Sequence, residues 1–258
     1  MVPTNSERRE TTVVPPHPVL NEYYSRPDER QGFVADLFDG CARYYNRVGA
    51  MLDLGSGRWY RRDALRRAGL RKGMRLLDVA AGTGLMTRGG VDIVGKENVV
   101  GVDPSQGMLG EAKKVVRAPL VRGRAEALPF RGDRFDMLSM GFALRHVPTL
   151  EMAFREYSRV LKPGGRMLLL EVSRPRSSAR RAILRIYLQR IVPMITRLGT
   201  RNEPAQVLMK FYWDTIDQCV PPETILEVLG QVGFTEVNRR VMFEFLSEYV
   251  ATKPLERR

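Results

Sequence analysis

Residues 76–84 read Leu-Leu-Asp-Val-Ala-Ala-Gly-Thr-Gly and place a glycine loop directly after a short apolar run. An apolar run of this length predicts a buried strand, and the glycines predict a turn into a helix. Glycine lets the backbone approach a ligand closely, and the first turn of a helix offers unpaired N–H groups. The stretch therefore predicts a ligand-binding loop, although an ordinary tight turn has the same pattern.

An acid follows the next apolar run. Asp103 ends the run 99–103, about 20 residues after the loop, where a carboxylate can accept hydrogen bonds from both ribose hydroxyls. A dinucleotide site normally has a third glycine, and Thr87 stands at that position. Asp78 precedes the loop, where a negative charge would repel a pyrophosphate and attract the ammonium group of a methionine moiety. Together these residues favour S-adenosylmethionine as the cofactor.

Short apolar runs alternate with helical stretches along the rest of the chain. This alternation predicts a parallel sheet with helices on both faces. The expected strands are 75–79, 98–102, 120–123, 134–140 and 166–172, with helices at 85–90, 105–116, 150–161 and 222–232 and two further strands within 235–250. We therefore predict an α/β fold with a doubly wound, mostly parallel, seven-stranded Rossmann-like sheet, an N-terminal helical cap and a helical insert after the fifth strand.

The composition shifts divide the chain into segments. Residues 1–32 are rich in proline and charge and predict a flexible N-terminal tail. We expect a single domain over 33–258, because the chain is too short for two full enzymatic domains. Its expected parts are the helical cap 33–72, the cofactor-binding core 73–172, the basic helical insert 173–221, and the last helix and strand pair 222–258.

The composition also narrows the class of protein. The chain has two cysteines and two histidines in no metal-ligand spacing, so we expect no metal site and a reducing, cytoplasmic location. No apolar run approaches the roughly 20 residues needed to span a bilayer, so we expect a soluble protein. The net charge of +13 favours an anionic partner: a nucleic acid, a phospholipid surface or an acidic substrate.

A set of motifs resembles, in order and spacing, class I S-adenosylmethionine-dependent methyltransferases. More narrowly, the set is similar to the ubiquinone/menaquinone biosynthesis C-methyltransferase family over about residues 38–175. The motifs are residues 78–84, 101–105 with Met108 and Leu109, 125–130, Phe135 with Asp136, Leu144 with Arg145, and 161–165. The resemblance implies methyl transfer to a small molecule.

The resemblance also implies the site residues. Those expected at the cofactor are Asp78, Ala81, Gly82, Thr83, Gly84, Asp103, Pro104, Met108, Arg124, Ala125 and Gly141, with Tyr45 and Arg61 at cap positions over it. Asp214 and Tyr212 are expected in the substrate pocket. The chain departs from the family pattern at Arg124, Gly141, His146 and residues 245–249, and we expect these departures to face that pocket.

Two neighbouring residues are candidates for catalysis. Methylating a phenol requires loss of a proton, and the imidazole of His146 titrates close to neutral pH, so it is the candidate general base. Arg145 is the candidate to hold the resulting phenolate by its charge. The sequence is equally consistent with a backbone-bonded histidine and with an arginine in a structural ion pair.

A basic segment follows the fifth expected strand. Between residues 174 and 201 there are eight arginines and no acid, interleaved with apolar residues at helical spacing. Such a segment can lie on an anionic bilayer and receive a lipid-soluble substrate, which would make the protein peripheral to the inner membrane face. A solvated cap helix has the same pattern. The sequence is also consistent with a homodimer.

The interpretation that combines these features is transfer of a methyl group to a carbon, or to an oxygen, of a small aromatic or quinone/polyprenyl-type acceptor. A nucleic-acid methyltransferase would explain the net charge of +13. However, no Asn/Asp-Pro-Pro-aromatic motif follows the fourth strand, so a nucleic-acid partner is not expected. A non-catalytic S-adenosylmethionine-binding accessory protein is the third alternative.

Overall fold

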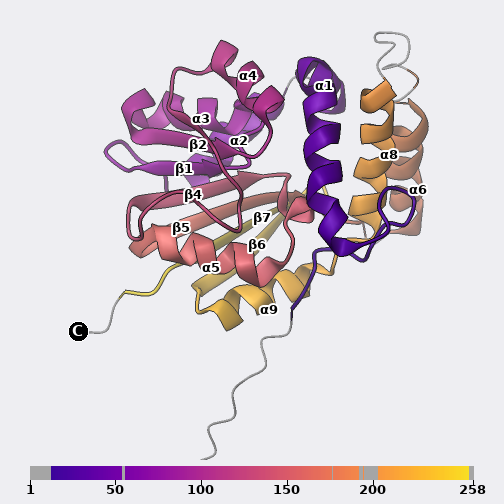
Figure 1. The fold of residues 1–258 in the computed structure, drawn as a ribbon. Helices are drawn as coiled ribbons and strands as arrows, with labels where there is room; N and C mark the ends of the chain where they lie inside the picture. The colour runs from indigo at the N-terminus through magenta and orange to yellow at the C-terminus, as the bar shows by residue number, and fades with distance from the viewer. Residues whose placement is uncertain (1–12, 54–55, 176, 192–193, 195–202, 256–258) are drawn as a thin grey trace, which may run out of the picture.

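The computed structural model describes residues 13–53, 56–175, 177–191, 194 and 203–255. These residues form a seven-stranded sheet in the order β3-β2-β1-β4-β5-β7-β6, with helices on both faces (Figure 1). The strands are β1 (Leu76–Val79), β2 (Val99–Asp103), β3 (Leu120–Arg122), β4 (Phe135–Gly141), β5 (Leu161–Val172), β6 (Thr235–Met242) and β7 (Leu246–Thr252). The predicted doubly wound fold is confirmed.

Strand directions also agree with the prediction. β1 runs parallel to β2 and β4, β3 is parallel to β2, and β5 is parallel to β4. β7 is antiparallel to both β5 and β6. β5 starts at Leu161, earlier than expected, because Leu161 pairs with Phe135 before a register shift at the turn that contains Gly164. Gly164 has φ +76°, a conformation that glycine adopts without strain.

The long helices are α1 (Arg30–Asp53), α2 (Gly57–Arg67), α3 (Leu85–Val94), α4 (Gln106–Val115), α5 (Leu150–Val160), α6 (Ser178–Ile186), α8 (Glu203–Asp217) and α9 (Pro222–Val232). Side chains of β4 alternate between two cores, as a pleated strand requires. Met137 belongs to the core under α2 and α3, and its neighbour Leu138 to the core under α5 and α9. Among the described helices, none is both long enough and apolar enough to cross a bilayer.

A third core lies between α1 and α8, which stand with α6 at one end of the sheet (Figure 1). On α1 the buried residues Val34, Leu37 and Cys41 recur every three or four positions and so share one face. They pack with Leu208 and Phe211 of α8. The predicted helical cap is therefore completed by a helix from the insert, far away in sequence.

The N-terminal segment differs from the expected flexible tail. Residues 1–12 lie outside the described residues, but from residue 13 the chain packs on the domain. Leu20 and Tyr24 are buried. The buried guanidinium of Arg30 donates to the backbone carbonyls of His17 and Val147. The prediction was wrong for 13–32 because proline-rich composition does not show that the few apolar residues there have partners elsewhere in the chain.

Candidate cofactor and acceptor site

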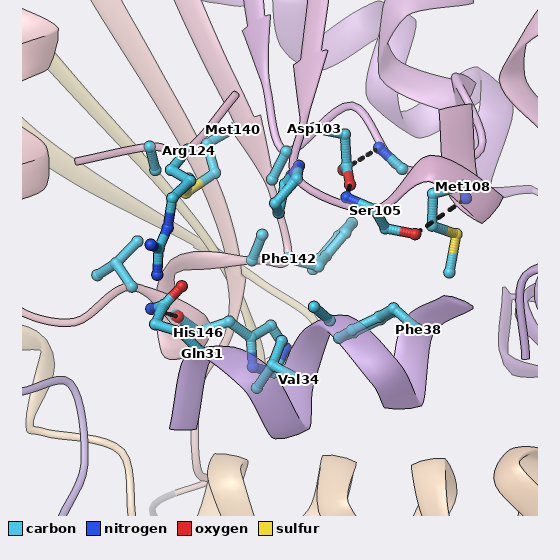
Figure 2. A pocket seen from close by; sticks show the side chains of 18 of the residues that line it. Gln31, Val34, Phe38, Asp103, Ser105, Met108, Arg124, Met140, Phe142 and His146 are labelled. Carbon is cyan, nitrogen blue, oxygen red and sulfur yellow. Dashed lines mark hydrogen bonds between the residues drawn. The ribbon is translucent and has the colours of Figure 1, made fainter. Parts of the chain in front are cut away.

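Two cavities meet at the carboxyl ends of β1, β2 and β4, where doubly wound sheets bind their ligands. The smaller has a volume of about 100 Å³ and lies between Asp103 and α1 (Figure 2). The larger has a volume of about 460 Å³ and extends under α6 and α8. Both cavities are lined by Tyr45, Ala80, Gly82, Gly141 and Phe142. They therefore form one connected site with two compartments.

The glycine loop takes a conformation that its sequence makes possible. Gly82 and Gly84 have φ values of +55° and +84°, in the left-handed region. A Cβ atom on Gly84 would lie 3.3 Å from the Cβ of Ala112, so glycine lets α3 and α4 approach closely. The N–H of Ala81 donates to the carbonyl of Val102 at 3.0 Å, which ties the loop to β2. The backbone of Gly82 is thereby held against both compartments.

Asp103 ends β2 and lines the smaller cavity. Its carboxylate accepts hydrogen bonds from the N–H of Gly82 at 2.8 Å and of Ser105 at 2.9 Å (Figure 2). Burial raises its pKa to about 6, opposed by these two hydrogen bonds. A carboxylate has about four acceptor positions, so two remain to bind hydroxyl groups. These free acceptor positions fit the two hydroxyl groups of the ribose of S-adenosylmethionine.

Helix α1 holds both the glycine loop and the start of α4 through polar residues that the sequence analysis missed. Thr83 donates its hydroxyl to Asn46 at 2.5 Å. Asp39 accepts hydrogen bonds from the Ser105 hydroxyl and from the N–H of Gly107. Asp39 and Asn46 lie seven positions apart, two turns of helix, and therefore share one face of α1. That spacing of polar residues within an otherwise core-facing helix is the signal that could have identified them.

Most residues predicted at the cofactor do meet here. Those that line the smaller cavity are Tyr45, Gly82, Asp103, Pro104, Met108, Arg124, Ala125 and Gly141. Ala81 and Thr83 line the larger cavity, and Gly84 precedes α3 without lining either. Half of the Arg124 side chain is exposed, and its guanidinium pairs with Glu126 at 2.8 Å. Cofactor binding by these residues stays a prediction.

Asp78 lies elsewhere than predicted. Its side chain is fully buried, and burial raises its pKa to about 6. It accepts hydrogen bonds from the hydroxyls of Thr87 at 2.6 Å and Ser139 at 2.9 Å, and it lines neither cavity. The predicted contact with a ligand ammonium is therefore corrected: both carboxylate oxygens bind neighbouring side chains and hold α3 and β4 to β1.

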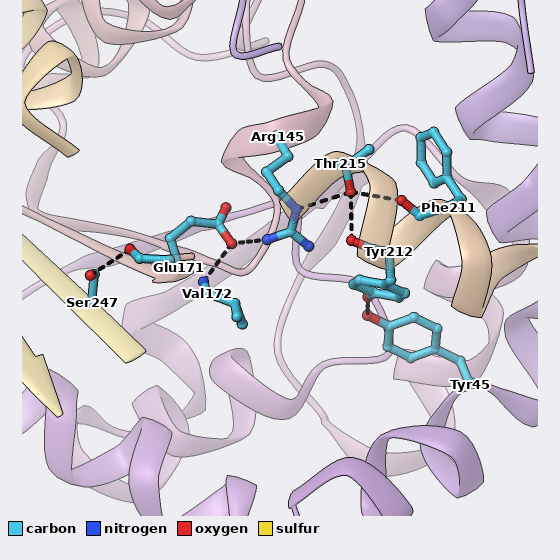
Figure 3. Close-up of polar contacts among 9 residues, drawn as sticks. Tyr45, Arg145, Glu171, Val172, Phe211, Tyr212, Thr215 and Ser247 are labelled. Atoms are coloured by element: carbon cyan, nitrogen blue, oxygen red, sulfur yellow. Dashed lines mark hydrogen bonds and ion pairs between the residues drawn. The ribbon is translucent and has the colours of Figure 1, made fainter. Parts of the chain in front are cut away.

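Arg145 also has a different role from the one predicted (Figure 3). The side chain is fully buried, pairs with Glu171, and donates from Nε to the Thr215 hydroxyl at 3.2 Å. It lines neither cavity. The predicted contact with a phenolate is corrected, because the charge of Arg145 is already neutralised inside the protein. Arg145 and Glu171 instead form a structural ion pair, the alternative that the sequence had left open.

His146 lines the smaller cavity. Its ring stacks on Phe211 with a centroid distance of 5.5 Å and meets the edge of Phe38 at 5.3 Å. Burial, helped by the charge of Arg145, lowers its pKa well below the usual value. The imidazole is therefore neutral and packed between aromatic rings at the wall of the smaller cavity. Its role as a general base stays a prediction.

Of the remaining predicted residues, two line the larger cavity and one lies outside both cavities. Asp214 accepts a hydrogen bond from the Tyr23 hydroxyl at 2.6 Å and lines neither cavity, which corrects its predicted substrate contact. Tyr212 lines the larger cavity, and its hydroxyl lies 2.5 Å from that of Tyr45. Arg61, predicted over the cofactor, lies among the residues of the larger cavity, 5.0 Å from the ring centroid of Phe142.

Comparisons with known proteins agree with this geometry. Residues 25–245 match the ubiE/COQ5 methyltransferase family. The chain is 30% identical over 219 residues to the ubiquinone/menaquinone biosynthesis C-methyltransferase UbiE of Shewanella oneidensis, covering 82% of this chain and 86% of that protein. The UbiE of Shewanella frigidimarina is 31% identical over the same coverage.

Solved structures share the fold at lower identity. A Thermotoga maritima methyltransferase, described as a possible histamine N-methyltransferase, superposes with a TM-score of 0.60 at 20% identity, covering 85% of this chain and 99% of that one. Haemonchus contortus phosphoethanolamine N-methyltransferase 2, in complex with S-adenosyl-L-methionine, gives a TM-score of 0.55 at 18% identity, covering 76% and 52%. The chain therefore belongs to the ubiE/COQ5 methyltransferase family and is an S-adenosylmethionine-dependent methyltransferase.

Proposed function

We propose that this enzyme methylates a carbon, or alternatively an oxygen, of a small aromatic or quinone-type acceptor that carries a polyprenyl chain. The observation that carries the proposal is the direct opening of the cofactor compartment into a large apolar one, with Gly82 and Phe142 in both walls. An apolar compartment suits an isoprenoid tail, since burial of apolar surface drives its binding. The relatives named for ubiquinone and menaquinone synthesis support the same acceptor class.

The walls of the larger cavity come from separate elements. The apolar residues that line it include Leu184, Leu188, Met209, Ile216, Phe243, Phe245 and Leu246. They belong to α6 and the segment after it, to α8, and to the hairpin of β6 and β7. A nucleic-acid acceptor would instead require a cationic groove that contacts phosphates, so these walls favour a small hydrophobic acceptor.

On the cofactor side we propose that Asp103 binds the ribose, that Gly82 and Thr83 hold the methionine part, and that Met108 packs on the adenine. When bound, S-adenosylmethionine supplies a methyl group on a positively charged sulfur. The loop and α1 would orient that group, because Thr83 is fixed to Asn46 of α1. Catalysis then depends mainly on the alignment of the two reactants.

The test of this function is the product of the reaction. A strain lacking the enzyme should accumulate an isoprenoid quinone precursor whose mass is lower by one methylene group than that of the normal product. Purified enzyme should convert that precursor with stoichiometric release of S-adenosylhomocysteine. If the deletion leaves the quinone fraction unchanged and alters a methylated nucleoside, the acceptor class is wrong.

Asp103→Ala should weaken S-adenosylmethionine binding by roughly 1 to 3 kcal/mol, the scale for loss of an anionic hydrogen-bond acceptor. The pH dependence follows from its pKa of about 6. The ionised carboxylate binds hydroxyls better, so affinity in the wild type should fall as the pH drops below about 6, and the variant should lack this dependence. Calorimetric titrations at two pH values measure both effects, with Asp133→Ala on the surface as the control. Equal affinity of Asp103→Ala and wild type would remove the residue from the site.

We also propose that the basic insert places the enzyme on the inner face of an anionic membrane. The described part of 174–191 contains Arg174, Arg180, Arg181, Arg185 and Arg190 and no acid. On α6, Ile183 is 67% exposed and Ile186 49% exposed, and Phe243 at the hairpin tip is 73% exposed. Arg180 pairs with Glu244, which joins helix and hairpin. Exposed apolar residues among arginines are typical of an interfacial surface.

Co-sedimentation with vesicles should therefore require anionic lipid. Each basic residue near such a surface contributes about 1 kcal/mol, screened over a Debye length of about 8 Å at physiological salt. Binding should be lost in neutral vesicles and at high salt, and weakened when Ile183 and Ile186 are both changed to serine. Met152→Ser, on α5 and 49% exposed, is the matched control. Equal binding of the wild type to neutral vesicles would contradict the electrostatic part of the proposal.

A further inference from the structure

The side chain of His146 has no hydrogen-bond partner among the described residues. Both of its ring nitrogens are shielded from solvent, and neither donates to nor accepts from another group. The ring stacks on Phe211 and packs against Phe38, two side chains without polar atoms. The backbone-bonded histidine that the sequence also allowed is therefore not what the structure shows. A buried polar group without a partner is rare in folded proteins, so its position at the wall of the smaller cavity is informative.

The other polar side chains of the smaller cavity are already engaged. Each of the following has a partner within the protein: Gln31, Tyr45, Asp103, Ser105, Arg124 and Glu126. Among the described lining residues, His146 is the one polar side chain that has none. Figure 2 shows it with Gln31 and Val34 of α1 along the same side of the cavity. A molecule that occupies the cavity can therefore supply the partner that the protein does not.

The chemistry of that molecule follows from Asp103, which lines the same cavity. Ribose bound at Asp103 brings the adenine into this cavity, because the base is attached to the ribose directly. Burial, helped by the charge of Arg145, lowers the pKa of His146 well below the usual value, so the imidazole is neutral. A neutral imidazole has one nitrogen free to accept a hydrogen bond. The 6-amino group of adenine offers N–H donors, and shielding them from water is costly unless they are bonded.

We propose that His146 accepts a hydrogen bond from the 6-amino group of the adenine and so makes the enzyme select an adenosine cofactor. This inference rests on the proposed contact between Asp103 and the ribose. It assigns His146 to cofactor binding, and it leaves removal of the proton of the acceptor to a different group.

The test compares two ligands that cannot react, so that binding is measured apart from turnover. They are S-adenosylhomocysteine and its 6-deamino analogue, in which hydrogen replaces the amino group of the adenine. In calorimetric titrations the wild type should bind S-adenosylhomocysteine roughly 3- to 10-fold more tightly than the analogue, the scale of one neutral hydrogen bond. His146→Phe keeps a flat ring between Phe38 and Phe211 but has no ring nitrogen, so it should bind the two ligands equally. If that variant does not fold, His146→Leu replaces it with the same expectation.

Asp103→Ala is the matched control in the same cavity. It should weaken the binding of both ligands by the same factor and leave their ratio as in the wild type, because the ribose contact does not involve the amino group. The inference is overturned if the wild type binds the two ligands equally, or if His146→Phe keeps the ratio of the wild type. An unchanged ratio together with a lower kcat at saturating cofactor would instead identify His146 as the general base.

The same titrations separate this failure from failure of the proposed function. Tight binding of S-adenosylhomocysteine by the wild type, without preference for the amino group, contradicts only the role of His146. If the wild type does not bind S-adenosylhomocysteine, the proposed cofactor site itself is wrong.

Discussion

Arg145→Met should lower the free energy of unfolding by about 3 to 5 kcal/mol, the cost of leaving one partner of a buried ion pair alone. The side chains of Arg145 and Glu171 are 0% and 2% exposed, so water cannot replace the lost partner. The change also removes the hydrogen bond to Thr215, which connects the chain after β4 to α8. Urea denaturation followed by circular dichroism measures the effect.

Two controls make this prediction specific. The double variant Arg145→Met, Glu171→Met should recover much of the loss, because no charge is then buried without a partner. Arg26→Met breaks the pair of Arg26 with Asp28, whose side chains are 67% and 69% exposed, and should cost only about 0 to 1 kcal/mol. If Arg145→Met costs no more than Arg26→Met, the pair of Arg145 and Glu171 is accessible to water, and a role for Arg145 in binding the acceptor becomes admissible again.

Gly82→Val should weaken S-adenosylmethionine binding at least about 100-fold, close to 3 kcal/mol. The residue has φ +55°, which a β-branched side chain rarely adopts, and its backbone lines both cavities. A Cβ built there has only the carbonyl oxygen of Ala80 within 4 Å, at 3.9 Å. The side chain would therefore meet no protein atom closely, but it would strain the backbone and occupy the space that the cofactor needs. Calorimetry with S-adenosylmethionine checks the affinity.

Gly73→Val separates the backbone effect from the effect on the ligand. Gly73 has φ +90° in an exposed turn before β1, and a Cβ there would meet nothing within 4 Å. Valine at this position should destabilise the fold by a similar amount, since the strain is similar, while affinity for the cofactor stays unchanged. Equal loss of affinity in both variants would show that loop stability, and not occupancy of the cleft, determines binding.

The sequence by itself determined the fold and the position of the glycine loop beside Asp103. The loop at 76–84 and Asp103 follow neighbouring parallel strands, and the carboxyl ends of such strands meet at one edge of the sheet whatever the rest of the chain does. Their positions in space are therefore implied by their order in the chain. The last two strands were predicted as well, and they pair antiparallel in the structure, because a short connection leaves adjacent strands few alternatives.

Only the tertiary structure decided what the polar side chains bind and where the larger cavity lies. The hydroxyls of Tyr45 and Tyr212 meet across 167 positions of sequence, and Asp214 bonds to Tyr23 across 191. A buried polar group must find a partner, but residue type and spacing do not show which distant group supplies it. Asp78 and Arg145 were predicted to bind ligands because their charges were visible in the sequence, whereas the partners that satisfy those charges became visible only once the chain was folded.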